Sequence, residues 1–124
     1  ASFGDTIVIS WNQSTETARA TAFAMPLLKK AKKVIVLTVE NFVVDGPTGA
    51  QCAEMLARHG IAVEAVSHPG GKSSGEDILD QTEKLGGDLL IKGAYTQSRL
   101  RQMIFGGATA HILAKAKMPV FMAN

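Results

Sequence analysis

At 124 residues the chain has the length of one domain, and its 46% hydrophobic content is sufficient for a core. The formal net charge of only +2 argues against a nucleic-acid-binding surface, and a single cysteine excludes an internal disulfide. The three histidines lack metal-ligand spacing, so we expect no metal site. No apolar run approaches the ~20 residues of a membrane span, so we expect a cytoplasmic protein with no membrane contact.

The first half of the chain alternates between strand and helix patterns. Residues 6–10 form a β-branched run that predicts a strand, and apolar residues at helical spacing predict a helix after Asn12. The residues with this spacing are Ala18, Ala22, Met25 and Leu28. The apolar run at residues 34–39 is typical of a strand covered on both faces in a parallel sheet. Pro47 suits the first position of the next helix, and Gly60 suits the left-handed turn that ends it.

The second half continues this alternation. Ser73 and Glu76 have the spacing of a capping box, which predicts the start of a helix that Gly86 ends. The other predicted elements are strands over residues 61–66, from Asp88 and over residues 118–122, and a helix over residues 107–115. Regular alternation of strands and helices predicts one α/β domain, residues 1–124, with a five-stranded parallel sheet and right-handed crossovers.

A loop suited to an anion follows the fourth predicted strand. The strand ends at Gly93, a polar loop follows, and Gly106 and Gly107 open the next helix. The polar loop carries Thr96, Ser98, Arg99 and Arg101. Unpaired backbone N–H groups at a helix N-terminus favour phosphate or another anion. Ligands of such sheets bind at the carboxyl ends of the strands where the winding reverses, so we expect Asn12 to lie near Gly93 and Gly106.

The spacing of this loop is also distinctive. Two residues separate Gly93 from Thr96, and nine more precede Gly106-Gly107. This resembles the Gly-x-x-Gly, nine residues, Gly-Ser/Thr pattern of universal stress proteins, and similar stretches at residues 7–14, 34–39 and 119–122 extend the resemblance over almost the whole chain. The motif Gly-Ala-Tyr-x-x-Ser-Arg-Leu-Arg at residues 93–101 is similar to the C-terminal halves of bacterial tandem stress proteins, and this resemblance favours a chain taken from a longer protein.

The resemblance implies a three-layer α/β/α sandwich of the adenine nucleotide alpha hydrolase-like type, with strand order 3-2-1-4-5. It also implies a site for ATP or another adenine nucleotide. In that site Asn12 takes the place of an acid at the ribose, Val39 that of the adenine wall, and the loop anchors are Gly93, Thr96, Gly106 and Gly107. Asn12 lacks the charge of an acid, Thr96 replaces a glycine and Gly107 removes a hydroxyl, so we predict weak binding.

Each of these residues also has a purely structural interpretation. Asn12 could instead help to cap the first helix. Arg99 and Arg101 could clamp a phosphate or simply be solvated, and Gly93 and Gly106 could serve backbone geometry alone.

Two function classes therefore remain open. The first is a stress-response module that binds an adenine nucleotide, and the second is a pairing module whose pocket has decayed. No residue near the cleft qualifies as a general base, so a slow ATPase is the weaker alternative and we do not expect a turnover enzyme. Members of the resembled family dimerise through the fifth strand, so we expect a homodimer, or pairing within a tandem protein, through residues 118–123, which begin at Met118 and end at Ala123.

Overall fold

The computed structural model describes residues 4–40, 43–71, 73–94 and 108–123. The strands are β1 (Thr6–Ser10), β2 (Lys33–Val39), β3 (Val63–His68), β4 (Leu89–Gly93) and β5 (Val120–Ala123). The helices in these ranges are α1 (Thr15–Phe23), α2 (Met25–Lys30), α3 (Gly49–Arg58), α4 (Ser74–Lys84) and α6 (Ala108–Lys115). The alternation expected from the sequence is thus present.

The five strands form one sheet in the order β3-β2-β1-β4-β5, and every neighbouring pair is parallel. β1 lies in the centre, where Ile9 pairs with Val36 of β2 on one side and with Ile91 of β4 on the other. These three side chains are fully buried. The predicted fold class and strand order are confirmed.

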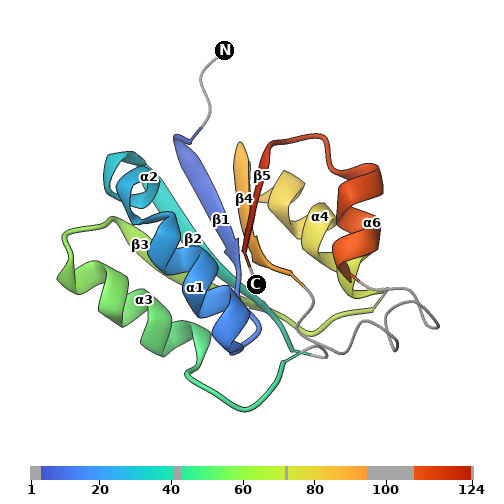
Figure 1. Ribbon diagram of the computed structural model, residues 1–124, viewed down its shortest axis with the longest axis horizontal. Coiled ribbons are helices and arrows are strands. Elements are labelled where there is room, and N and C mark those ends of the chain that lie inside the picture. The colour runs from blue at the N-terminus through green and yellow to red at the C-terminus, as the bar shows by residue number, and fades with distance from the viewer. Residues whose placement is uncertain (1–3, 41–42, 72, 95–107, 124) are drawn as a thin grey trace.

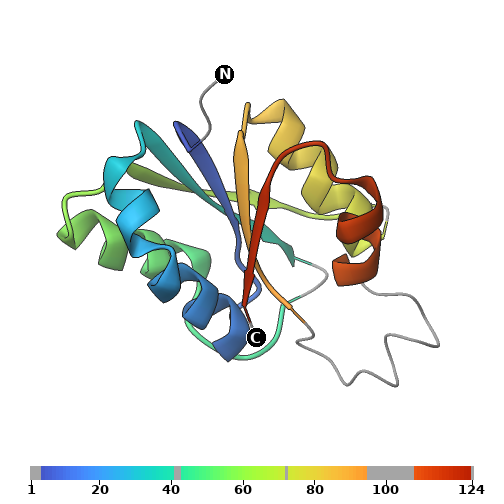
Figure 2. The same ribbon diagram turned by 45° about the horizontal axis from the view of Figure 1, so that its top comes forward.

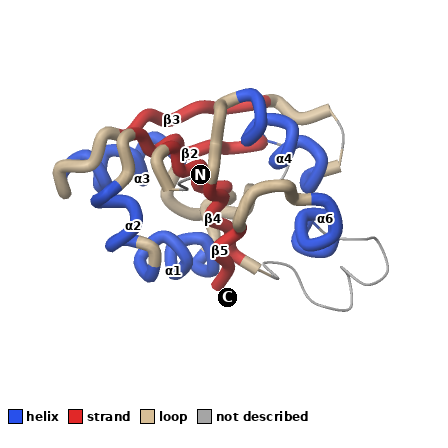
Figure 3. Tube along the Cα trace, turned by 90° about the horizontal axis from the view of Figure 1, so that it is seen from above, coloured by secondary structure: helices blue, strands red, loops and turns tan. Residues whose placement is uncertain are grey.

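Helices cover both faces of the sheet, and this produces the three layers expected. Helices α1, α2 and α3 lie on one face and α4 and α6 on the other, as Figures 1 and 2 show and as the view from above confirms (Figure 3). Alternate residues of each strand serve the two sides: Ile9 joins the core under α1–α3, whereas Val8 joins the core under α4 and α6. Both faces must therefore be apolar, which explains the continuous apolar runs in the sequence.

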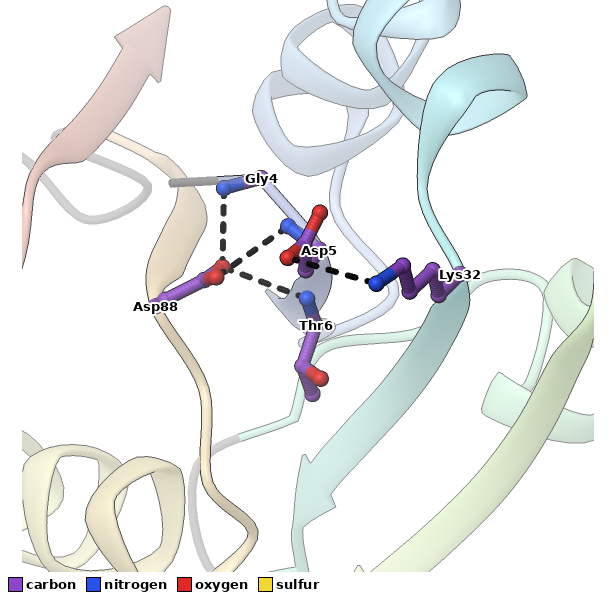
Figure 4. A network of polar contacts seen from close by, with 5 residues as sticks. All are labelled: Gly4, Asp5, Thr6, Lys32 and Asp88. Atoms are coloured by element: carbon purple, nitrogen blue, oxygen red, sulfur yellow. Dashed lines mark hydrogen bonds and ion pairs between the residues drawn. The ribbon is translucent and has the colours of Figure 1, made fainter. Parts of the chain in front are cut away.

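Asp88 fastens the amino end of β1 to the start of β4. Its carboxylate accepts hydrogen bonds from the backbone N–H groups of Gly4, Asp5 and Thr6, at 2.9, 3.1 and 3.2 Å (Figure 4). The Asp88 N–H donates in turn to the Thr6 carbonyl at 2.9 Å. Lys32, beside this network, lies 3.9 Å from a carboxylate oxygen of Asp5. This network lies at the amino ends of β1 and β4, and the predicted site lies at their carboxyl ends.

The first predicted helix differs from the structure in its buried face. The chain forms two helices, α1 and α2, which meet at Ala24, and Ala18 and Ala22 are exposed. Thr17 and Thr21 are buried instead, because the Thr21 hydroxyl donates to the Thr17 carbonyl at 2.8 Å. A hydroxyl satisfied within its own helix can be buried, and a pattern read from apolar residues alone misses it.

Several element boundaries also shift. Pro47 precedes the helix, and Thr48 is the N-cap of α3: its hydroxyl accepts from the Gln51 N–H at 3.1 Å, and the Gln51 side chain accepts from the Thr48 N–H at 2.8 Å. Strands β3 and β5 each begin two residues later than predicted. Ser73 caps α4 as expected, and the positive φ values of Gly60 and Gly86, 78° and 75°, confirm the predicted helix ends.

Candidate functional site

The winding of the sheet reverses between β1 and β4. The chain moves outward from β1 through β2 to β3, then returns to pair β4 with the other side of β1. Ser10 of β1 is in register with Lys92 of β4, so the carboxyl ends of these two strands are side by side. In parallel sheets the connections that leave the two strands at such a reversal run in opposite directions, and the crevice between them can hold a ligand. The expected proximity of Asn12, two residues beyond Ser10, to Gly93 follows from this register.

Asn12 is part of the cap of α1. Ser14 is the N-cap residue, and its hydroxyl accepts from the Thr17 N–H at 3.2 Å. The side-chain oxygen of Asn12 accepts from the Ser14 N–H at 3.2 Å and from the hydroxyls of Ser14 and Thr17. Asn12 therefore helps to cap α1, as its structural interpretation requires, and its side-chain oxygen Oδ1 accepts hydrogen bonds from three donors of the protein.

The segment that follows β2 folds over the end of β1. The indole N–H of Trp11 donates to the Pro47 carbonyl at 2.8 Å, and the Val44 N–H donates to the Asn12 carbonyl at 3.0 Å. A Cβ atom on Gly46 would lie 2.0 Å from the Gln13 carbonyl oxygen, so only glycine permits this close approach. Gln13 itself has a φ of 69°. These contacts shape one wall of a pocket.

The pocket has a volume of about 280 Å³ and lies at the carboxyl ends of β2 and β3, beside the start of α3. Its lining residues are Gln13, Thr38, Glu40, Val43, Gly49, Ala50, Ala65, Val66 and Ser67. The Ser67 hydroxyl donates to the Glu40 carboxylate at 2.9 Å, so two of the polar lining residues are hydrogen-bonded to each other. The sequence analysis missed this pocket, although alternation along β2 places Thr38 on the same face as Val36.

Val39 has a different position from the one its predicted role suggests. Its side chain is 5% exposed and packs in the core under α4 and α6, with Leu37 and Ile78 among its neighbours in that cluster. It does not line the pocket. A contact between Val39 and adenine stays a prediction, and its side chain is committed to the core.

Gly93 is required by packing. A Cβ atom at this position would lie 2.6 Å from the backbone nitrogen of Thr17 and 2.8 Å from the carbonyl carbon of Glu16. The end of β4 therefore touches the first turn of α1. This explains the glycine without a ligand, and it joins Gly93 to Asn12 through their shared neighbour Thr17.

Lys92 is a feature of the site that the sequence analysis did not identify. Lys92 is only 6% exposed, and its ammonium donates a hydrogen bond to the Gly93 carbonyl at 2.8 Å. Burial lowers the pKa of Lys92 from 10.5 to about 8. The signal in the sequence was a lysine inside an apolar run, directly before the glycine that ends the strand.

The remaining predicted site residues, Thr96, Arg99, Gly106 and Gly107, lie outside the described residues, so their roles stay predictions. Within the described ranges, His, Cys, Asp and Glu side chains form no group of three that could hold a metal ion. Among the same residues, no helix has the length and apolar character needed to cross a bilayer. Burial raises the pKa of the Cys52 thiol to about 11, as befits a core residue.

Comparison with known proteins gives a consistent result. The model of the universal stress protein family matches residues 5–124. A universal stress protein from Archaeoglobus fulgidus DSM 4304 superposes with a TM-score of 0.77 and 21% identity, covering 98% of this chain and 44% of its own, so this chain spans less than half of that protein. No curated protein sequence matches significantly.

Two further structures of similar fold contain nucleotides. An Arabidopsis thaliana protein of the universal stress protein family with AMP bound has a TM-score of 0.66 and 17% identity, with coverage of 95% of this chain and 89% of its own. An Archaeoglobus fulgidus universal stress protein in complex with dAMP has a TM-score of 0.62 and 16% identity, with coverage of 96% of each chain. At these identities the likeness establishes the fold.

Proposed function

The chain belongs to the universal stress protein family, and from this premise we propose that it binds an adenine nucleotide weakly at the carboxyl edge of its sheet. The observation that carries the proposal is the reversal of winding between β1 and β4, with Ser10 and Lys92 in register there. Two proteins of the same fold hold AMP and dAMP, which supports the same class of ligand here.

The pocket beside β2 fits one part of such a ligand. Its volume of about 280 Å³ suits a nucleobase better than a whole nucleotide. Ala50 and Ala65 supply apolar contacts for the faces of a planar ring, while Gln13 and Glu40 supply polar atoms for its edge. We place the base in this pocket and the phosphate toward the end of β4.

Weak binding follows from the state of Asn12. An acid at this position would accept a charge-assisted hydrogen bond from ribose, which is about twice as strong as a neutral one. Asn12 has no charge, and its side-chain oxygen already accepts from Ser14 and Thr17. We therefore expect a Kd for AMP between about 10 μM and 1 mM, or about 4–7 kcal/mol of binding free energy.

Titration calorimetry with AMP, ATP and GMP tests the proposal, after any co-purified nucleotide has been removed and identified. We expect AMP and ATP to bind in the stated range and GMP to bind more weakly. The variant Ala50→Leu fills the pocket from α3 and should weaken AMP binding by about tenfold or more. The control Ala57→Leu places the same side chain on an exposed position of the same helix, away from the pocket, and should bind AMP like the parent.

Two results would contradict this assignment. Absence of binding at millimolar AMP would remove the nucleotide function itself. Unchanged AMP affinity in Ala50→Leu would leave nucleotide binding in place but move the base out of the pocket.

The exposed position of β5 in the sheet favours a second candidate function, pairing with another chain or domain. β5 is the last strand in the sheet order, and the carbonyls of Pro119 and Ala123 accept from the N–H groups of Leu90 in β4 and of Ala94 directly after it. Because successive residues of a strand point their backbone groups to opposite sides, Val120 and Met122 direct theirs away from β4. An edge with such groups pairs readily with a second strand.

Sedimentation velocity over a wide concentration range tests the pairing. We expect a dimer for the parent and a monomer for Met122→Pro, because proline removes an outward N–H while the hydrogen bonds to β4 at Pro119 and Ala123 remain. Circular dichroism shows whether the variant is folded. A parent chain that stays monomeric at the highest concentration would refute this second function.

A further inference from the structure

Gln13 has a backbone conformation that is unusual for its residue type. Its φ is 69°, and in the part of the chain that the structure describes it is the one residue other than glycine with a positive φ. A Cβ atom disfavours this left-handed region, and asparagine or aspartate tolerates it better than glutamine does. Such a conformation persists where its surroundings fix it, and residues of this kind gather at ligand sites.

The backbone around Gln13 is fixed by the segment that follows β2. On the amino side of Gln13, the Asn12 carbonyl accepts from the Val44 N–H at 3.0 Å. The carbonyl of Gln13 faces Gly46, where a Cβ atom would lie only 2.0 Å from the carbonyl oxygen. These contacts involve backbone atoms, so a change of the Gln13 side chain leaves them in place.

The side chain of Gln13 is available for a ligand. Gln13 is half-buried and lines the pocket at the carboxyl ends of β2 and β3. Among the described residues, none forms a hydrogen bond with its side-chain amide. Glu40 of the same lining, by contrast, accepts from Ser67. A primary amide is planar and offers a donor and an acceptor side by side, whereas a carboxylate offers acceptors alone.

We propose that Gln13 recognises the base of the bound nucleotide, with its side-chain amide paired to the amino group and an adjacent ring nitrogen of adenine. This inference rests on the proposed nucleotide function and names a residue that sets its preference for adenine. The adenine amino group donates to the amide oxygen, and the ring nitrogen accepts from the amide nitrogen. These are the two bonds by which glutamine reads adenine in DNA.

A nucleotide without the amino group tests this pairing directly. Purine riboside 5′-monophosphate differs from AMP only in having hydrogen in place of the 6-amino group, so it leaves the amide oxygen without a donor. One neutral hydrogen bond corresponds to about a fivefold change in affinity. In titration calorimetry we therefore expect the parent to bind AMP about fivefold or more tightly than purine riboside 5′-monophosphate.

Two variants separate the amide from the backbone. Gln13→Met keeps a side chain of similar length but removes the amide, and Gln13→Gly removes the whole side chain from a position whose φ suits glycine. We expect each variant to bind the two nucleotides with affinities within about twofold. The control, Gln81→Met, makes the same exchange in α4, outside the lining residues of the pocket, and should keep the preference of the parent.

A second measurement follows the amide directly and needs no variant. In ¹⁵N-labelled parent protein, AMP should shift the side-chain NH₂ signals of Gln13, and ribose 5-phosphate, which lacks the base, should leave them in place. Absence of AMP binding would remove the nucleotide function and this inference with it. Three results would overturn the role of Gln13 while the nucleotide function stands: a parent that binds the two nucleotides equally, a preference for AMP that persists in either Gln13 variant, or Gln13 signals that do not respond to AMP.

Discussion

Gly93 and Thr17 are so close that a Cβ atom on the glycine would lie 2.6 Å from the backbone nitrogen of the threonine. Thr17 also donates its hydroxyl to Asn12, so the end of β1, the first turn of α1 and the end of β4 pack as one unit. The geometry of the candidate site is thus fixed by the start of α1. A change at Gly93 would be transmitted to Asn12 through Thr17.

Gly93→Ala tests this packing. The added methyl group meets backbone atoms, which can move only if α1 or β4 shifts, so we expect a loss of about 1–3 kcal/mol in the free energy of unfolding. Gly71→Ala is the control, because a Cβ atom there would have no heavy atom within 4 Å and Gly71 does not have a positive φ. Urea denaturation measures both. Equal stability of the two variants would show that the contact is not tight in solution.

Lys92 makes stability depend on pH in a predictable direction. Its pKa in the folded chain is about 8, against 10.5 for the free side chain, so the unfolded chain binds more protons between these values. The free energy of unfolding should therefore rise from pH 8 toward pH 10.5, by at most about 3 kcal/mol, and this gain is absent below pH 8. Denaturation of parent and Lys92→Met across this range isolates the contribution, which the variant should lack.

Cys52 acts in the opposite direction at higher pH. Burial raises its pKa from 9.0 to about 11, so the folded chain keeps a proton that the unfolded chain releases, and stability falls between these values. Above about pH 9 the two effects therefore oppose each other. The difference between the parent and Lys92→Met removes the thiol contribution, since both chains contain Cys52. A flat difference between pH 8 and 9 would contradict the buried position of the ammonium.

Asp88→Asn tests the connection between the amino ends of β1 and β4, at the other end of these strands from the candidate site. The variant replaces an oxygen that accepts from backbone N–H groups with an amide that donates, next to Gly4, Asp5 and Thr6. We expect a loss of about 1–3 kcal/mol in stability, with faster hydrogen exchange at the three amides. Asp45→Asn, in an exposed loop, provides the control and should change stability by less than about 0.5 kcal/mol.

The architecture could be predicted because the sequence expresses it in strong local patterns. The apolar runs around Val36 and Ile91 indicate strands buried on both faces, and Gly60 and Gly86 mark helix ends through the backbone conformation that they adopt. Local patterns do not set the order of the strands, which the family resemblance supplied. The buried face of α1 was misread because Thr17 and Thr21, although polar, satisfy their hydroxyls locally.

The site was harder to predict because its contacts join residues that are distant in sequence. The role of Gly93 in accommodating Thr17 depends on a packing distance that no spacing encodes. The pocket combines side chains from Gln13 to Ser67, and their convergence depends on the register of β2 with β3. Lys92 was visible in the sequence, but its burial follows only from the pairing of β4 with strands on both sides.

Asn12 permits a test that separates its two interpretations. Asn12→Ala removes the oxygen that accepts from Ser14 and Thr17, so we expect stability to fall by about 1–2 kcal/mol, the range of a lost cap. Asn12→Asp keeps the acceptor and adds a negative charge at the N-terminus of α1, which should preserve stability or raise it by up to about 1 kcal/mol. Because the oxygen is already engaged, the parent should bind AMP and dAMP with affinities within about threefold, or roughly 0.7 kcal/mol. A larger preference for AMP that disappears in Asn12→Ala would instead assign the Asn12 side chain to the ribose.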